Sequence, residues 1–274
     1  MRIIHRISIA SSAEVRKELA GLGVAVSDRG IVSFEIDEDL DTWPGIRDWV
    51  KRRRAVDVPW TEFSLDELAD AQWLQLVGDW HYGYPQPDEN GFGYLEATYD
   101  LTDWCRECGV GGRQRAPFQM RGEPKWGRRS ILQLNWVFDE YLVTPQAWSQ
   151  VFRPWGVECR AVNNTKGIEL KTVVQLVVSE SVGIVPDGLA SERCHRCGRI
   201  KYLPVSRGPF PALAERPMQH MARTKEYFGS GGQAFKGVIV SQALARNIRN
   251  SVIRGALLRP VRSPVPPLAF PRPG

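Results

Sequence analysis

The chain has 274 residues, of which 43% are hydrophobic and 24% are charged, and this is the composition of an ordinary globular protein. Its length suffices for one large domain or two modest ones. No apolar run approaches the roughly twenty residues of a membrane-spanning helix, and no signal-peptide core follows Met1. We therefore expect a cytoplasmic protein without a membrane partner.

The net charge of +5 hides an asymmetry along the chain. Residues 1–100 contain 10 basic and 19 acidic side chains, whereas residues 101–274 contain 26 basic and 12 acidic ones. A basic second half is compatible with nucleic-acid binding, but the same charges suit an ordinary solvated surface or attraction between the halves. We favour the second interpretation and keep nucleic acid as an alternative partner.

Residues 1–78 are predicted to form a small α+β module with helices on one face of a sheet. Ser11 and Glu14 have the spacing of a capping box, which predicts a helix from Ala13 to about Ala20. The other expected elements are a strand over 2–9, a hairpin over 24–26 and 31–36 with its turn at 28–30, a helix from about 42 or 44 to 53, and a helix between Ser64 and Gly78.

Residues 79–104 are predicted to connect this module to the second half. Residues 79–90 are rich in aromatic residues, prolines and turn formers, which indicates an ordered loop. His81 lies among these aromatics, and we interpret it as a packing residue rather than a catalytic base. Residues 92–104 are expected to form a strand.

Four of the five cysteines occur in two copies of Cys-x-x-Cys-Gly, one with Cys105 and Cys108 and one with Cys194 and Cys197. Two thiolates at this spacing can turn onto one cation, and the following glycine permits the tight turn. Four thiolates complete a tetrahedral zinc site that has no open position for a substrate. We therefore predict a structural Zn²⁺ bound by all four cysteines.

Three other interpretations of the cysteines stay open: a disulfide within each pair, two unrelated thiol pairs, and a thioredoxin-like redox pair. The redox interpretation requires a pair that opens a helix, and neither following stretch resembles a helix start. Cys194 follows Cys108 by 86 positions, far more than the roughly fifteen to twenty of common zinc ribbons. A folded insert must therefore bring the two pairs together.

Residues 105–261 are predicted to form a zinc-knuckle-containing α/β region with a weak internal duplication, followed by a Pro-rich tail over 262–274. We call each Cys-x-x-Cys-Gly motif a knuckle, the first at 105–109 and the second at 194–198. The two copies, at about 105–162 and 194–261, share the order knuckle, loop, strand, capped helix, glycine and strand. A further buried strand is expected over 169–178.

Particular residues mark the corresponding positions in the two copies. Thr144 and Ser241 are the expected helix N-caps. Gly156 and Gly255 are expected to open the final strands, and the first copy is expected to have strands over 130–143.

A basic stretch over residues 113–129 is interleaved with Phe118 and Trp126. Such a pattern can bind single-stranded nucleic acid through phosphate contacts and base stacking. We favour a hairpin whose aromatic side chains face the core and whose cations face water.

The chain contains no Walker A loop, dinucleotide glycine motif, nucleophile elbow, His-Glu-x-x-His or zinc-deaminase pattern. Asp139 and Glu140 are adjacent, so on a strand they would point to opposite faces. His195 and His220 are candidate additional ligands or bases, and we interpret both as structural. Cys159 is interpreted as a small core hydrophobe. A non-enzymatic binding protein is favoured, and an enzyme of unknown class remains an alternative.

The doubled Cys-x-x-Cys-Gly, together with the closing strand, capped helix and residues 257–261, resembles the double-CXXCG immunity proteins of bacterial toxin–immunity systems. The resemblance covers about residues 105–261, and the two knuckles are its specific part. In that family the first knuckle is expected much nearer the start of the chain. The resemblance implies a small cytoplasmic protein that neutralises a cognate toxin by binding it.

Overall fold

The computed structural model describes residues 1–27, 30–251 and 253–263, and it contains two compact units. The first unit comprises Met1–Glu67 with Val205–Pro209, and the second comprises the rest of the chain. Helices and strands occur together in mixed sheets, which confirms the predicted α+β class. No helix among the described residues is long and apolar enough to cross a membrane.

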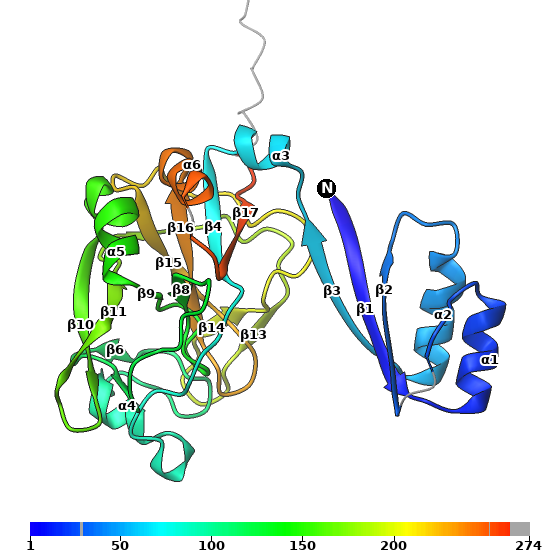
Figure 1. The fold of residues 1–274 in the computed structure, drawn as a ribbon, viewed down its shortest axis with the longest axis horizontal. Coiled ribbons are helices and arrows are strands. Elements are labelled where there is room, and N and C mark those ends of the chain that lie inside the picture. The colour runs from blue at the N-terminus through cyan, green and yellow to red at the C-terminus, as the bar shows by residue number, and fades with distance from the viewer. Residues whose placement is uncertain (28–29, 252, 264–274) are drawn as a thin grey trace, which may run out of the picture. The chain divides into compact units, whose positions relative to one another are not determined.

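An antiparallel sheet with the order β2-β1-β3 forms the first unit. Its strands are β1 (Arg2–Ala10), β2 (Ile31–Asp37) and β3 (Val56–Glu62). The helices α1 (Ala13–Gly21) and α2 (Trp43–Arg53) lie on one face of this sheet (Figure 1). Fully buried residues from both layers make up their common core: Ile7, Leu19, Ile46 and Trp49.

Three details of this unit differ from the predictions. The N-cap of α1 is Ser12, whose hydroxyl accepts from the Val15 amide, while Ser11 accepts from Arg16 instead. Residues 24–26 are not a strand, because β2 pairs directly with β1; the predicted turn at 28–30 lies partly outside the described residues. β3 was not predicted.

The helix predicted between Ser64 and Gly78 is wrong in its second half. Only α3 (Leu65–Asp70) is helical, and β4 (Trp73–Gly78) is a strand. Leu74 and Leu76 are both buried, because alternate residues of a strand point to the same face. β4 pairs with β16 on one side and with β17 on the other. The first unit therefore ends at Glu67, not at residue 78.

A short segment of the second half also belongs to the first unit. Residues Val205–Pro209, which fall inside the predicted zinc domain, are part of the first unit. The Gly208 amide donates to Thr61 Oγ1 over 2.8 Å, and Arg207 forms an ion pair with Glu38. These contacts join residues more than 140 positions apart, so the sequence of the segment alone does not predict them.

Two larger sheets form the second unit. The first has the order β7-β10-β11-β9-β8. Its strands are β7 (Gln119–Met120), β8 (Ile131–Leu132), β9 (Leu142–Val143), β10 (Glu158–Asn164) and β11 (Glu169–Val177). The second has the order β13-β14-β15-β16-β4-β17, and β12 also pairs with β15. Its further strands are β12 (Ser181–Val182), β13 (Ser191–Arg193), β14 (Ile200–Tyr202), β15 (Met221–Phe228), β16 (Phe235–Ser241) and β17 (Ala256–Pro260).

The two predicted copies share one topology. In the first copy, β9 and β10 both pair antiparallel with β11, so they run parallel to each other with β11 between them. In the second copy, β16 and β17 both pair antiparallel with β4 and are parallel to each other in the same way. Each copy is therefore a split β-α-β unit whose central strand comes from outside the repeated segment.

The connecting helices begin at the predicted caps. The Thr144 hydroxyl accepts from the Ala147 amide, and the Ser241 hydroxyl accepts from the Leu244 amide. The first helix is irregular: α5 (Pro145–Ala147) continues as the π-helical turn η2 (Trp148–Phe152) and the 3₁₀ turn η3 (Arg153–Trp155). The second, α6 (Gln242–Asn250), is a regular α-helix.

The two helices join the copies through one core. Asn247 Nδ2 on α6 donates to the Val151 carbonyl over 3.1 Å. Buried residues from both copies and from β4 share a cluster that includes Leu76, Val143, Phe152, Val240 and Leu244. Gly156 and Gly255 both adopt positive φ where the chain leaves each helix. Figure 1 shows α5 and α6 at the same end of the second unit.

Two predicted strand regions contain little strand. Residues 92–104 contain α4 (Gly93–Thr98) and the short β5 (Tyr99–Asp100), preceded by η1 (Glu89–Gly91); β5 pairs with β6 (Arg113–Gln114). Of residues 130–143, only β8 and β9 are strands. The loop between them carries the aromatic residues Trp136, Phe138 and Tyr141.

A buried ion pair links the two sheets of the second unit. Both carboxylate oxygens of Glu140, which precedes β9, accept from the guanidinium of Arg223 on β15, at 2.6 and 2.8 Å. Gln175 on β11 also donates to Glu140 over 2.7 Å. The Glu140 side chain is only 4% exposed, so the pair lies in a region where an uncompensated charge is costly.

Glu140→Gln leaves Arg223 without its main counter-charge. We expect this substitution to lower the free energy of unfolding by about 3 kcal/mol. Glu35→Gln, which breaks the exposed pair with Arg6, should cost less than about 1 kcal/mol. Chemical denaturation of both variants measures the difference, and equal costs would contradict the importance assigned to the buried pair.

Candidate metal centre

The two Cys-x-x-Cys-Gly motifs adopt the same backbone turn. The Cys105 amide donates to the Val110 carbonyl and the Gly109 amide to the Cys105 carbonyl, at 2.9 and 2.8 Å. The second motif repeats both bonds, from Cys194 to Arg199 and from Gly198 to Cys194, each at 2.9 Å. The two glycines have φ of 77° and 72°, which explains why glycine follows the second cysteine of each pair.

The fold brings all four of these cysteines together. Cys105 Sγ lies 3.8 Å from Cys194 Sγ, and Cys108 Sγ lies 3.6 Å from Cys197 Sγ. The four sulfur atoms all lie within 4.8 Å of one another. Zn–S bonds of about 2.3 Å in a tetrahedron require sulfur atoms about 3.8 Å apart. The cluster therefore fits a metal ion such as zinc.

The sulfur positions also bear on the alternative interpretations. A disulfide requires two sulfur atoms about 2.05 Å apart, and all five cysteines are free here. Each short sulfur contact joins one motif to the other, which disagrees with two unrelated thiol pairs. Neither motif opens a helix, as a redox pair would.

Burial and charge differ among the thiols. Cys105, Cys108 and Cys194 are buried, whereas Cys197 is exposed. The amide of Cys108 donates to the Cys105 sulfur and, with other hydrogen bonds, lowers the pKa of Cys105 to about 6. Burial raises the pKa of Cys108 to about 12. The protein alone thus favours one thiolate and opposes a second, and a bound cation is the charge that would stabilise all four.

Two basic side chains from the second motif hold the first motif in place. Lys201 on β14 is 3% exposed, and its ammonium group donates to the carbonyls of Cys108, Gln233 and Gly231. Arg199 donates to the carbonyls of Asp103 and Val110 on either side of the first knuckle. Both side chains therefore fix the backbone of the first knuckle through its carbonyl groups.

The two motif glycines differ in their surroundings. A Cβ at Gly109 would lie 2.4 Å from the Gly232 carbonyl oxygen, whereas a Cβ at Gly198 would meet open space. Gly109 is therefore required both by its backbone conformation and by the loop packed on it. At Gly198 only the conformation requires glycine.

The other candidate residues lie outside the sulfur cluster. His195 is 82% exposed, with Nε2 3.8 Å from Glu107. His220 Nδ1 lies 2.8 Å from Ser241 Oγ, and its ring packs edge-on against Trp155. His81 packs near Phe138, and burial lowers its pKa. Cys159 is partly buried, and burial raises its pKa, as expected for a packing thiol rather than a nucleophile.

The basic stretch over residues 113–129 forms many contacts within the protein. Arg113 pairs with Asp103 and Arg121 with Asp88, while the Arg129 guanidinium lies over the Trp80 ring. Phe118 is fully buried, and the Trp126 indole donates to the Thr172 carbonyl. The aromatic side chains pack inward as expected, but the predicted hairpin is wrong, because β6 pairs with β5 and β7 pairs with β10.

Lys201 was not singled out from the sequence as functional, and Glu140 was considered only as a carboxylate adjacent to Asp139. A lysine on a strand normally indicates an exposed position, and only the loop at 229–234 makes this one buried. No sequence signal identified its three carbonyl partners. Comparison of this chain with protein-family models, with curated proteins and with solved structures found no match.

Substituting alanine for each motif glycine separates the two requirements. Gly198→Ala should lower the free energy of unfolding by about 1 kcal/mol, the cost of a left-handed non-glycine residue. Gly109→Ala should cost about 1–3 kcal/mol more, because the Gly232 carbonyl must also move. Thermal and chemical unfolding of the metal-loaded variants measures both values. Equal losses would contradict the close packing at Gly109.

Proposed function

We propose that this chain is a zinc-stabilised binding protein without catalytic activity at its metal centre. The observation that carries the proposal is the cluster of four cysteine sulfurs within 4.8 Å of one another. Four protein ligands saturate tetrahedral zinc, whereas catalytic zinc sites keep a position for water or substrate. The ion would then connect the two knuckles and stabilise the second unit. Free thiols of this kind require a reducing compartment, so we propose the cytoplasm.

We further propose a protein as the partner, and a cognate bacterial toxin as that protein. The support is the resemblance of the doubled knuckle and the capped helix that follows it to double-CXXCG immunity proteins. A rigid, metal-stabilised scaffold suits such binding, because preorganised surfaces lose little entropy on association.

Nucleic acid is the second candidate partner, and one observation favours it. The second knuckle is exposed and carries Arg193, Arg196 and Arg199. Arg193 and Arg199 already donate to backbone carbonyls, which reduces what they can offer to phosphates. Binding to oligonucleotides that weakens steeply with salt would support this candidate over the toxin.

Removal of one ligand tests the metal centre. Cys105→Ser and Cys194→Ser should reduce bound zinc from one ion per chain to none and unfold much of the second unit, because zinc affinity of this kind is folding free energy. Cys159→Ser, which alters the cysteine outside the cluster, should retain the zinc. Native mass spectrometry and thermal unfolding provide the readout. A Cys105 variant that keeps both its zinc and its melting temperature would sink the proposal.

The immunity function is tested by protection in cells. Production of the protein encoded beside this chain should arrest growth, and co-production of this chain should restore it through formation of a complex. The Cys194→Ser variant should fail to protect, and Cys159→Ser should protect fully. A neighbouring protein that is harmless, or one that does not bind this chain, would rule out the toxin as partner while leaving the metal centre intact.

A further inference from the structure

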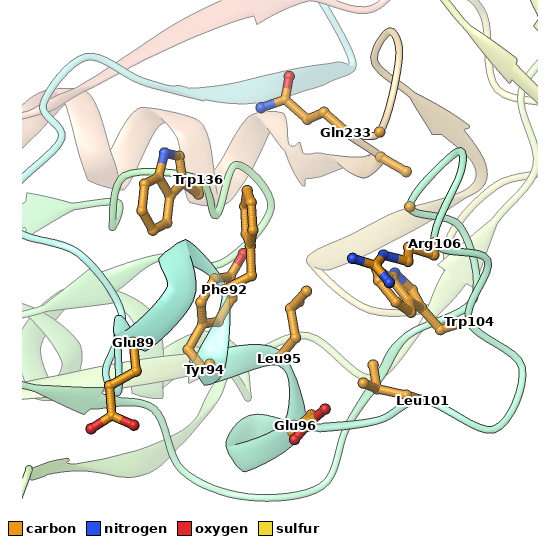
Figure 2. Close-up of a pocket in the computed structure, with 14 residues that line it drawn as sticks. Glu89, Phe92, Tyr94, Leu95, Glu96, Leu101, Trp104, Arg106, Trp136 and Gln233 are labelled. Atoms are coloured by element: carbon orange, nitrogen blue, oxygen red, sulfur yellow. The ribbon is translucent and has the colours of Figure 1, made fainter.

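A groove of about 700 Å³ lies beside the first knuckle. In Figure 2, Phe92, Tyr94, Leu95 and Trp136 form one wall, and Trp104 and Arg106 form the opposite wall. Gly109 of the knuckle and the loop with Gln233 complete the lining. A cavity of this volume, lined mostly by aromatic and apolar side chains, has the character of a binding site.

A smaller cavity of about 90 Å³ continues the groove inward. The two share Tyr94, Leu95, Trp104 and Trp136 among their lining residues. The inner cavity adds aromatic rings and one carboxylate: Tyr99, Phe138, Tyr227 and Asp139. Its volume lies well below the roughly 300–1,000 Å³ of small-molecule pockets, so it suits a single inserted side chain.

Trp136 is held in an unfavourable conformation at the groove. Its φ is 70°, in the left-handed region that bulky residues rarely occupy, and its side chain is 38% exposed. Three rings surround it, with centroids 4.5 Å away for Tyr84, 5.3 Å for Phe92 and 6.3 Å for Tyr94. Strained residues cluster at functional sites, and exposed aromatic side chains of this kind are frequent anchors in protein interfaces.

The charge of the inner cavity favours a cation. Glu140 and Arg223 neutralise each other in their bidentate pair, and the Asp139 carboxylate is left at 4.0 Å from Arg223. Asp139 also accepts from the Lys236 amide over 3.0 Å, while the Lys236 ammonium lies over the Tyr227 ring. Burial, reinforced by Glu140, raises the pKa of Asp139 to about 6. A positive charge in the cavity would stabilise the ionised form of Asp139, which burial disfavours.

The outer groove adds to this preference. Glu89 and Glu96 line it, and Arg106 is its basic residue. The lining residues of the two cavities therefore include three carboxylates and one guanidinium, while Arg223 and Lys236 lie behind Asp139 and Tyr227. The faces of tyrosine and tryptophan rings attract cations as well, so the rings and the carboxylate favour the same ligand charge.

We propose that this groove binds an apolar segment of a partner protein and that the segment inserts one lysine or arginine side chain into the inner cavity. The cationic group lies among the aromatic rings and faces Asp139, and the flanking apolar residues pack on Phe92 and Trp136. This inference rests on the proposed function as a protein-binding scaffold, and it specifies the chemistry of the partner surface.

The proposal is tested on the full-length, zinc-loaded protein with tripeptide amides as probes. Acetyl-Leu-Arg-Leu-amide is compared with the same peptide carrying citrulline, which keeps the shape of arginine without its charge, and with the lysine peptide. Indole ¹⁵N signals, assigned from tryptophan variants, report binding near Trp104 and Trp136. The arginine or the lysine peptide should bind with a Kd of about 1 mM, and the citrulline peptide about tenfold more weakly.

Two variants and one control establish where the charge is recognised. Asp139→Asn keeps an acceptor for the Lys236 amide and should weaken binding of the arginine peptide about tenfold. Trp136→Gly accommodates the positive φ and removes the ring, so it should weaken all three peptides. Asp66→Asn, in the first unit, should bind as the unaltered protein does.

Three results would overturn the inference: equal affinity for the arginine and citrulline peptides, unchanged affinity after Asp139→Asn in a variant that melts normally, and no shift at either indole up to about 10 mM peptide. These outcomes are separate from the tests of zinc content and toxin protection. Failure of protection with intact peptide binding would count against the toxin alone.

Discussion

The second unit depends on bringing two cysteine pairs together across 86 positions of chain. Closing a loop of that length costs conformational entropy. This cost is offset by the intervening strands, by the shared core, and by Arg199 and Lys201, which follow the second motif. Lys201 and Arg199 donate to carbonyls next to the first pair and hold its backbone. These donors and the shared core bring the four sulfurs together, and a bound metal ion would stabilise the resulting cluster.

One cysteine pair precedes each of the two duplicated units, and these units pack against each other. Each copy is a split β-α-β unit, and the helices of the copies pack in one core. The central strand of the first copy, β11, follows it in the chain, whereas that of the second copy, β4, comes from near residue 75. The region before the first knuckle is thus part of the unit that contains the four clustered cysteines, which distinguishes this chain from the arrangement that the family resemblance implied.

The aromatic groove depends on the same architecture. Gly109 and the loop packed against it form part of the groove, so a change in the knuckle would alter the groove as well. The buried pair of Glu140 and Arg223 holds the segment that presents Asp139. Residues that stabilise the second unit therefore also shape the groove. Because Glu140 neutralises Arg223, the Asp139 carboxylate sets the preference of the inner cavity for a cation.

The sequence by itself determined the local features: the α+β class, the paired cysteines, the two helix caps at Thr144 and Ser241, and the glycines that turn each knuckle. The caps and the knuckle turns depend on contacts within a few residues, and the α+β class follows from the periodicity of the apolar residues. Tertiary structure decided the rest. Residues 73–76 have an apolar spacing compatible with a helix or a strand, and pairing with β16 and β17 selected the strand. Lys201, Asp139 and Trp136 have ordinary sequence surroundings. The burial of Lys201, the charge environment of Asp139 and the ring contacts of Trp136 arise from segments 30 to more than 90 positions away, because these contacts form only when the chain folds.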